Sequence, residues 1–145
     1  MYTTLAIYLT LLFKLGGVNN PEGNHLLKIE GIKDIQGNIA IMVFNSEVGF
    51  PKDESKAILK KVLPVNKKQM TIPLGNLPSG DYAISVIQDV NINEKLDVNV
   101  LGMPKEPFGF SNNASILFGL PGFNRAKITF NEIEKITTIK LIDLY

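Results

Sequence analysis

Residues 77–89 read LPSGDYAISVIQD and hold the strongest strand signal in the chain. The stretch opens with a turn signal, because Pro78 fixes its own φ and Gly80 permits a positive one. A regular alternation follows at once, which predicts a strand. Tyr82, Ile84, Val86 and Gln88 share one face of that strand, and Ala83, Ser85 and Ile87 share the other.

The same period of two recurs on the N-terminal side of this stretch. Residues 39–44 carry apolar side chains on both faces, which indicates a central, covered strand. Residues 26–32 precede it, and the turn KDIQGN between the two predicts a hairpin. Residues 68–77 form another strand, in which Pro73 lacks an amide donor, so that strand lies at an edge or bends there.

The C-terminal part adds two strands, NRAKITFNE and TTIKLIDLY, and the NEIEK between them is short enough for a hairpin. Residues 53–61 permit either a short helix capped by Asp53 or an edge strand. About seven strands, spaced by turn signals, with at most one short helix, predict an all-β antiparallel sandwich or barrel.

Composition places limits on function. The 145 residues suit one domain, and 15 basic against 14 acidic residues give a net charge of +1, without the clustered basic face that nucleic acid requires. The absence of cysteine excludes disulfides, thiolate catalysis and cysteine zinc sites. With His25 as the one histidine, a multi-histidine metal site is excluded within one chain, and we expect His25 to be exposed.

The N-terminus, MYTTLAIYLTLLFKLGG, is apolar over a length too short to span a membrane but suited to a signal segment. No basic residue precedes the run, Lys14 interrupts its end, and a good cleavage site is lacking, so a genuine N-terminal helix or strand stays open. We favour a signal or targeting segment over residues 1–17, a linker over 18–25 and one sandwich domain over 26–145. Export to the periplasm or the exterior follows from that choice.

A polar segment follows the strongest strand, and two interpretations of it are open. Asp89, Asn91, Asn93 and Asp97 follow the spacing of the first part of a calcium loop, but Glu94 stands where such a loop has glycine and Val100 where it has glutamate. Glu106 is the nearby carboxylate that could complete a weak calcium site. Alternatively, Asp and Asn side chains accept from backbone amides two residues on and organise the loop without an ion.

The continuation, GMPKEPFGFSNN, is equally open. Phe108 and Phe110 either pack over the end of the sandwich, with Ser111, Asn112 and Asn113 pinning the loop, or form a binding patch. The candidate patch is Tyr82, Phe108, Phe110, Asn112 and Asn113. Asp89, Asp97 and Glu106 also permit a carboxylate pair of the glycosidase kind, although spacing in the sequence does not establish their separation.

These motifs together resemble a bacterial family called domain of unknown function 2141. The resemblance covers about residue 26 to the C-terminus and rests on LPSGDYA, on Asp89-x-Asn91-x-Asn93-x-x-x-Asp97, on Gly102-x-Pro104-x-Glu106 and on GFSNN. It implies an exported protein, mostly of Gram-negative cells, with a transthyretin-like or immunoglobulin-like sandwich, and it supplies no activity. Relatives usually carry glycine where this chain has Ile92 and Glu94. A tight loop that requires positive φ would be strained by Ile92, so we expect a relaxed or weakened loop in this chain.

Three hypotheses follow. The first is a non-catalytic β-sandwich module that binds, or associates structurally, in the cell envelope, with residues 89–113 as its site and an envelope or extracellular partner. The second is a calcium-stabilised module of the same fold. The third is a small carboxylate-dependent hydrolase.

Overall fold

The computed structural model describes residues 25–145, so the targeting segment expected over residues 1–17 lies outside the described residues. Eight strands, one short α-helix and two 3₁₀ helices form in the described part. The strands are β1 (His25–Glu30), β2 (Asn38–Phe44), β3 (Leu59–Pro64), β4 (Met70–Gly75), β5 (Gly80–Asp89), β6 (Phe108–Phe110), β7 (Ile128–Phe130) and β8 (Ile136–Lys140). The helices are η1 (Glu54–Lys56), η2 (Ser111–Asn113) and α1 (Phe123–Ala126).

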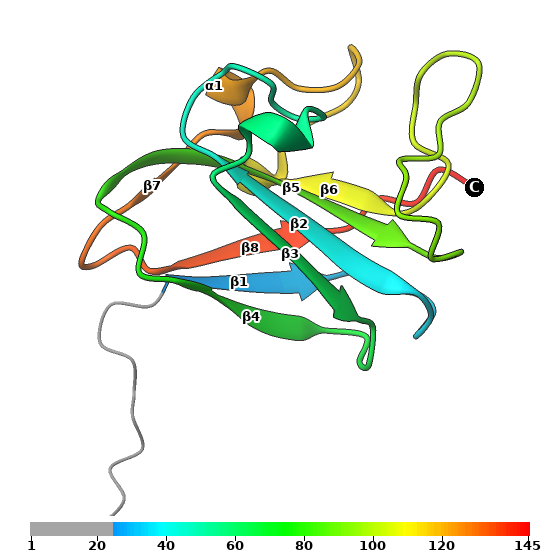
Figure 1. Ribbon diagram of the computed structural model, residues 1–145, viewed down its shortest axis with the longest axis horizontal. Coiled ribbons are helices and arrows are strands. Elements are labelled where there is room, and N and C mark those ends of the chain that lie inside the picture. Colours follow the sequence, from blue (N-terminus) through cyan, green and yellow to red (C-terminus); the bar gives the residue numbers. More distant parts are fainter. Residues whose placement is uncertain (1–24) are drawn as a thin grey trace, which may run out of the picture.

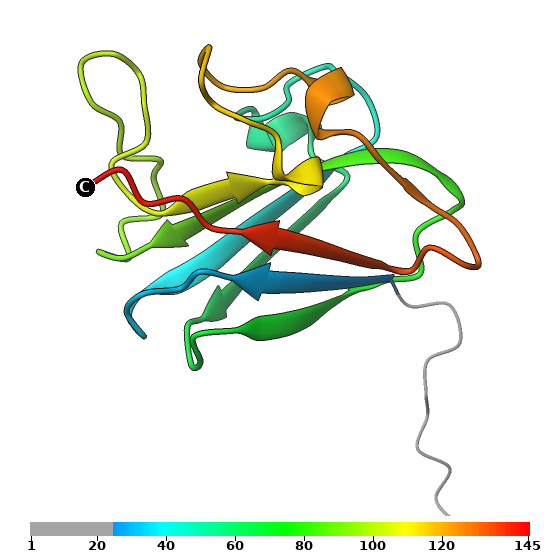
Figure 2. The same cartoon turned by 180° about the vertical axis from the view of Figure 1, so that it is seen from behind.

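The strands form two sheets packed face to face (Figures 1 and 2). One sheet has the order β4-β1-β8, and the other has the order β3-β2-β5-β6, with β7 also paired to β5. Among the described pairings, β1 with β8 is parallel and the others are antiparallel. The predicted all-β sandwich is confirmed, with eight strands where about seven were expected.

The main core lies between the two sheets, and β5 contributes one face to it as predicted. Tyr82, Ile84 and Val86 point inward and are buried in this core. Gln88 shares their face, and its side-chain amide donates to the carbonyls of Asp34 and Gln36, both at 2.9 Å. The alternation of residues 82–88 thus specifies which side of β5 meets the other sheet.

A second apolar cluster covers the outer face of the larger sheet. It is built on Ala83, Phe108 and Phe110, which lie on the other face of β5 and on β6. Residues of the loops and of α1 close over them: Phe50, Met103, Ile116, Leu120 and Phe123 pack against this cluster. The loops that carry Phe50, Met103, Ile116 and Leu120 are therefore anchored to the sheet at these residues.

The two sheets are joined where β6 meets the end of β8. Phe108 and Ile142 exchange backbone hydrogen bonds of 3.0 and 2.7 Å. A Cβ atom on Gly109 would lie 2.6 Å from Cγ2 of Ile139, so only glycine allows the sheets to approach this closely. The glycine of the GFSNN motif is thus required by packing.

Both predicted hairpins are wrong. β1 and β2 belong to different sheets, and β7 pairs with β5 while β8 pairs with β1. Short connections with turn residues suit hairpins, but they suit equally a chain that crosses from one layer of a sandwich to the other. The strand at residues 68–77 is an edge strand, as Pro73 indicated, because β4 ends its sheet.

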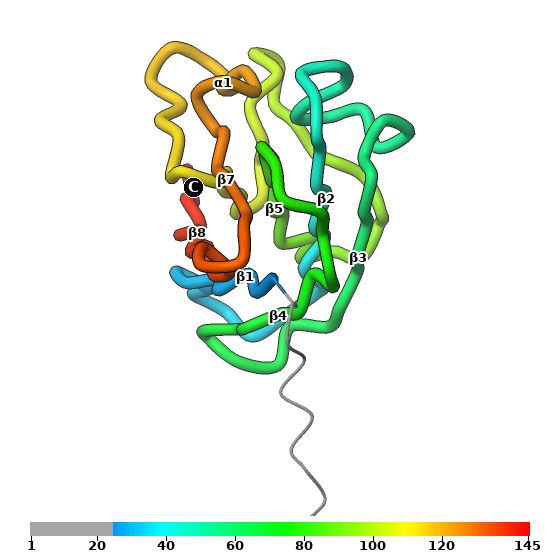
Figure 3. Tube along the Cα trace, turned by 90° about the vertical axis from the view of Figure 1, so that its left-hand side faces the viewer, coloured from blue at the N-terminus to red at the C-terminus, as the bar shows by residue number. Residues whose placement is uncertain are grey.

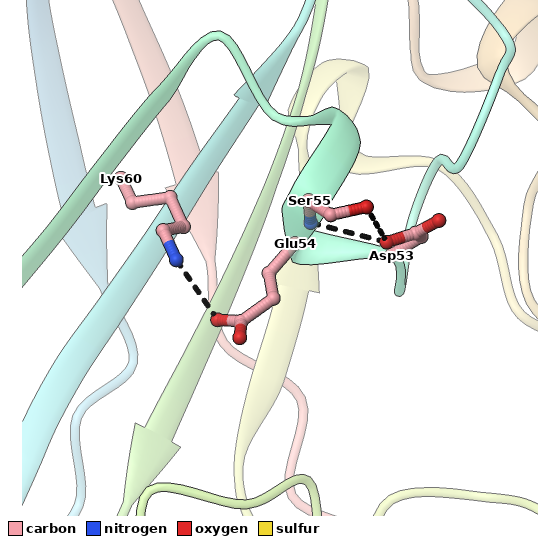
Figure 4. A network of polar contacts seen from close by, with 4 residues as sticks. All are labelled: Asp53, Glu54, Ser55 and Lys60. Atoms are coloured by element: carbon pink, nitrogen blue, oxygen red, sulfur yellow. Dashed lines mark hydrogen bonds and ion pairs between the residues drawn. The ribbon is translucent and has the colours of Figure 1, made fainter.

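Residues 53–61 contain both of the expected alternatives, a short helix and the start of an edge strand. Asp53 accepts hydrogen bonds from the amide and the hydroxyl of Ser55, at 3.0 and 2.6 Å, and so caps η1 (Figure 4). Lys60, at the start of β3, pairs with Glu54 at 3.2 Å in the same view. The helix is one turn long, and the edge strand β3 begins directly after it.

His25 is buried, contrary to expectation, with 3% of its surface exposed. Its Nδ1 accepts from the amide of Leu77 at 3.3 Å, and its ring lies 4.3 Å from that of Phe130. The first residue of a hairpin strand beside a linker would be exposed, but β1 lies between β4 and β8. Its place in the middle of a sheet buries its first residue.

Candidate functional site

The polar loop, residues 89–106, begins at the end of β5, where Asp89 is buried. Oδ1 of Asp89 accepts from the amide of Asn93 at 3.2 Å, and Oδ2 accepts from the amide of Glu94 at 2.9 Å. The loop backbone has no partner strand here, so its amides require such acceptors. Asp89 therefore holds the start of the loop in a closed turn.

Asn91, Asn93 and Asp97 complete this turn. Oδ1 of Asn91 accepts from the amide of Asn93 at 3.1 Å, and Oδ1 of Asn93 accepts from the amide of Lys95 at 3.0 Å. The side-chain amides of both asparagines donate to Oδ2 of Asp97, at 2.8 and 2.9 Å. The structure thus brings the four predicted residues together, and it bonds them to their own backbone and to one another.

Ile92 and Glu94 have left-handed backbone, with φ of 57° and 58°. These are the two positions at which the resemblance described above implies glycine. An L-residue with a branched side chain is strained in this region, by about 1–2 kcal/mol. The strain expected from Ile92 in a tight loop is therefore present, and Asp89 holds this turn closed through the amides of Asn93 and Glu94.

Glu106 closes the loop from its far end. Its Oε1 accepts from the amide of Val90 at 2.8 Å, while its Oε2 is buried and lacks a hydrogen-bond partner. Burial raises the pKa of this carboxyl, the backbone amides of Val90 and Asn91 oppose that rise, and the carboxylates of Asp89 and Asp97 add to it. Glu106 is thus a buried acid, 8% exposed, beside two other acids.

The donor set fits a hard cation only in part. Carboxylate and amide oxygens are the ligands that calcium prefers, and an unpartnered buried oxygen on Glu106 is consistent with a missing positive charge. However, two amide nitrogens point at Asp97, and no group of three or more acidic or histidine side chains in residues 25–145 is arranged to hold a metal. Binding an ion would require both asparagines to turn their oxygens toward Asp97.

The same residues offer little to carboxylate catalysis. A glycosidase pair needs two carboxyl groups that reach the substrate from opposite sides. Asp89 and Glu106 are buried and accept from the backbone, and Asp97 alone is partly open to solvent. The raised pKa of Glu106 therefore reflects burial under the loop.

The segment from Phe108 to Asn113 is fixed to three other elements by side-chain hydrogen bonds. Oγ of Ser111 accepts from the amide of Ile84 at 2.8 Å and donates to the carbonyl of Ala126 at 2.5 Å. Asn112 donates to the carbonyl of Arg125 at 3.0 Å, and Oδ1 of Asn113 accepts from the amide of Lys140 at 3.0 Å. These bonds tie η2 to β5, α1 and β8.

The candidate binding patch is not assembled at the surface. Tyr82 is buried in the main core, where its hydroxyl donates to the carbonyl of Pro78 at 2.6 Å. Phe108 and Phe110 are buried in the second cluster, and of the five residues only Asn112 and Asn113 are exposed. The packing interpretation of the two phenylalanines agrees with this placement.

Sequence reasoning missed two turns that expose apolar side chains. Val100 and Leu101 lie at the tip of one, and Leu117 and Phe118 at the tip of the other, and all four are exposed. The available signal was an apolar pair directly before a glycine in a region of turn residues, as in NVLG and ILFG.

The comparisons with known proteins address the family alone. A family model described as "Uncharacterized protein conserved in bacteria (DUF2141)" matches residues 27–138. No curated protein and no solved structure matches the chain significantly. In residues 25–145, no helix has the length and the apolar character needed to cross a membrane.

Proposed function

Because the chain belongs to the family of uncharacterised bacterial proteins described above, we propose its function from its own geometry. It is a non-catalytic β-sandwich module that acts by binding or structural association in the bacterial cell envelope. The working end is the side of the larger sheet that carries the polar loop and the loop around residue 118.

One observation carries this proposal. The long loops are preorganised: Asp89 and Asn93 close the polar loop, and Ser111 fixes the next segment to β5 and α1. Rigid loops on a rigid sandwich bind with a smaller loss of conformational entropy than mobile loops do. Polar side chains that serve the backbone in this way support a recognition surface more than a reaction centre.

Co-sedimentation with purified envelope fractions tests the proposal. The full chain is mixed separately with native membranes and with peptidoglycan sacculi, and we expect it to pellet with at least one of them. Retention in the supernatant with both would remove the binding proposal. Export is tested separately in the native cell, where an intact N-terminus in the soluble cytosolic fraction would contradict it.

A second candidate, a calcium-stabilised module, is favoured by the orphaned Oε2 of Glu106 beside Asp89 and Asp97. Calcium would supply the positive charge that this oxygen lacks. The competing amide bonds to Asp97 make the site weak, so millimolar calcium is the relevant range.

Calorimetric titration with calcium, together with thermal unfolding, tests this candidate. At about ten times Kd, calcium would stabilise the fold by roughly 1.4 kcal/mol, and Asp97→Asn would abolish the gain. Asp143→Asn, which removes a carboxylate outside the polar loop, is the matched control and retains the gain. An absence of both binding heat and a melting shift in the wild type would end the calcium hypothesis.

A further inference from the structure

Two exposed turns at the working end carry adjacent apolar pairs. Val100 and Leu101 are 103% and 82% exposed, and Leu117 and Phe118 are 78% and 87% exposed. Turns normally carry glycine, proline and small polar residues, so apolar pairs at two tips are unusual. We call residues 99–102 and 116–119 the apolar turns.

The first apolar turn is rigid. Oδ1 of Asn99 accepts from the amides of Leu101 and Met103, at 2.9 and 3.1 Å. Val98 and Pro104 form a bridge at its base, and the amide of Gly102 donates to the carbonyl of Asn99 at 2.9 Å. The fixed backbone presents Val100 and Leu101 to solvent.

The second apolar turn is anchored from both sides. Ile116 and Leu120 pack into the second cluster, so the residues between them are directed outward. The amide of Gly119 donates to the carbonyl of Ile116 at 3.0 Å, and the guanidinium of Arg125 donates to the carbonyl of Ser115 at 2.5 Å. Leu117 and Phe118 thus extend from a fixed base.

Both apolar turns project from the same side of the molecule, as all three views of the chain show (Figures 1, 2 and 3). The shallow crevice between their bases is lined by Leu96 and Pro104 from one loop and by Leu120 from the other, and its volume is about 10 Å³. A space of this size holds no small-molecule ligand. The tips themselves are therefore the available contact surface.

We propose that the two apolar turns together contact the surface of an anionic lipid membrane. The proposal rests on the proposed envelope function and names its partner. Protruding apolar tips insert into a disordered headgroup layer without needing a complementary shape, whereas a protein partner needs a contiguous, fitted surface.

The charges around the tips favour anionic lipid. Lys105 follows the first turn, and Arg125 lies under the second; both are exposed, and residues 107–131 contain no acidic residue. Lys52 lines the crevice between the turns, and its neighbour Asp53 is exposed as well. The acid closest in sequence to the first turn, Asp97, is partly buried and accepts two amide hydrogen bonds. Basic side chains next to inserted apolar residues add attraction to anionic headgroups.

The chain has no tryptophan, so a single introduced indole reports insertion directly. We expect the fluorescence of Phe118→Trp to shift to the blue with phosphatidylglycerol-containing vesicles and to shift less with phosphatidylcholine vesicles. Ile133→Trp is the matched control, because Ile133 is 89% exposed in the turn between β7 and β8, away from the apolar turns (Figure 1). No shift in Phe118→Trp, or equal shifts in both variants, overturns the proposal.

Vesicle co-sedimentation tests the apolar contact itself. Leu101→Ser combined with Leu117→Ser should lower partitioning about tenfold or more, because two exposed apolar side chains leave the lipid. Ile133→Ser should leave partitioning unchanged, and both variants should melt like the wild type. Unchanged partitioning of the double variant overturns the proposal.

The experiments distinguish a failure of the proposed envelope function from a failure of the proposed lipid contact. Binding to sacculi or native membranes without binding to protein-free vesicles leaves the envelope function standing and overturns the lipid contact. Concentration-dependent sedimentation that the double serine variant abolishes would assign the tips to a second copy of this chain, and would likewise overturn it.

Discussion

At the scale of single residues, Glu106 is a buried acid with a shifted pKa. Burial raises this pKa, and the nearby carboxylates of Asp89 and Asp97 raise it further. Its pKa is therefore higher in the folded than in the unfolded chain, where it is about 4.3. The folded state binds this proton more tightly, so the contribution to stability is full below the unfolded value and is lost as pH rises through the folded value. Glu106→Gln should remove this loss of stability at higher pH, because glutamine stays uncharged.

Thermal unfolding across this pH range, in the presence of a chelator, measures the effect. We expect Glu106→Gln to melt higher than the wild type at neutral pH and to converge with it in acid. Glu132→Gln changes an exposed glutamate in the turn after β7 and should follow the wild-type profile. A neutral-pH melting temperature of Glu106→Gln below that of the wild type would contradict this account.

Ile92 and Glu94 hold left-handed backbone that glycine adopts without strain. Ile92→Gly should stabilise the chain by about 0.5–1 kcal/mol, since the relief of strain exceeds the added freedom of the unfolded chain. Its side chain is half exposed, so little burial is lost. The expected rise in melting temperature is about 2–4 °C per kcal/mol.

Ile35→Gly is the control for this substitution. Ile35 is exposed to a similar degree but does not have positive φ, so glycine there should lower stability. A fall in the melting temperature of Ile92→Gly comparable to that of Ile35→Gly would show that the left-handed turn stores no strain.

At the scale of elements, Ser111 joins η2 to both β5 and α1. Ser111→Ala leaves the buried amide of Ile84 and the carbonyl of Ala126 without this partner, at about 1–3 kcal/mol for each unsatisfied group. Ser115→Ala removes an exposed hydroxyl that accepts from the amide of Leu117, and should change stability by less than about 0.5 kcal/mol. Equal unfolding midpoints for the two variants in denaturant would refute the pinning role.

Individual elements were predictable from the sequence where the signal was local. The faces of residues 82–88, the edge position of Pro73 and the Asx turns of Asn91 and Asn93 all depend on neighbours within a few residues. The partners of Ser111 were not predictable, because Ile84 lies 27 residues away and the sequence holds no trace of the contact. The apolar turns were missed for another reason: a pattern method reads an apolar pair as core, and only the fold exposes it.

At the scale of the whole molecule, the sandwich class was predictable and its connections were not. Strand period and spacing predict an antiparallel sandwich or barrel, but β1 pairs in parallel with β8, which lies more than 100 residues along the chain. Pairing over such a separation depends on which hydrophobic faces meet, and several registers satisfy the same alternation. The burial of His25 was missed because it follows from this pairing.

The open side of the sandwich lies between the edge strands β3 and β4, where a cleft of about 620 Å³ is lined by Lys61, Leu63 and Ile72, among others. Nζ of Lys61 donates to the carbonyl of Pro73, and Pro73 has no amide to offer a new strand. An inward-facing lysine and a proline are devices that keep sheet edges from pairing between molecules.

We therefore expect Lys61→Val combined with Pro73→Val to self-associate with rising concentration in sedimentation velocity experiments. Lys60→Val adds the same side chain to the exposed face of β3, keeps both devices, and should sediment as the wild type does. If the double variant also sediments like the wild type at every concentration, the edges are protected by something other than these two residues.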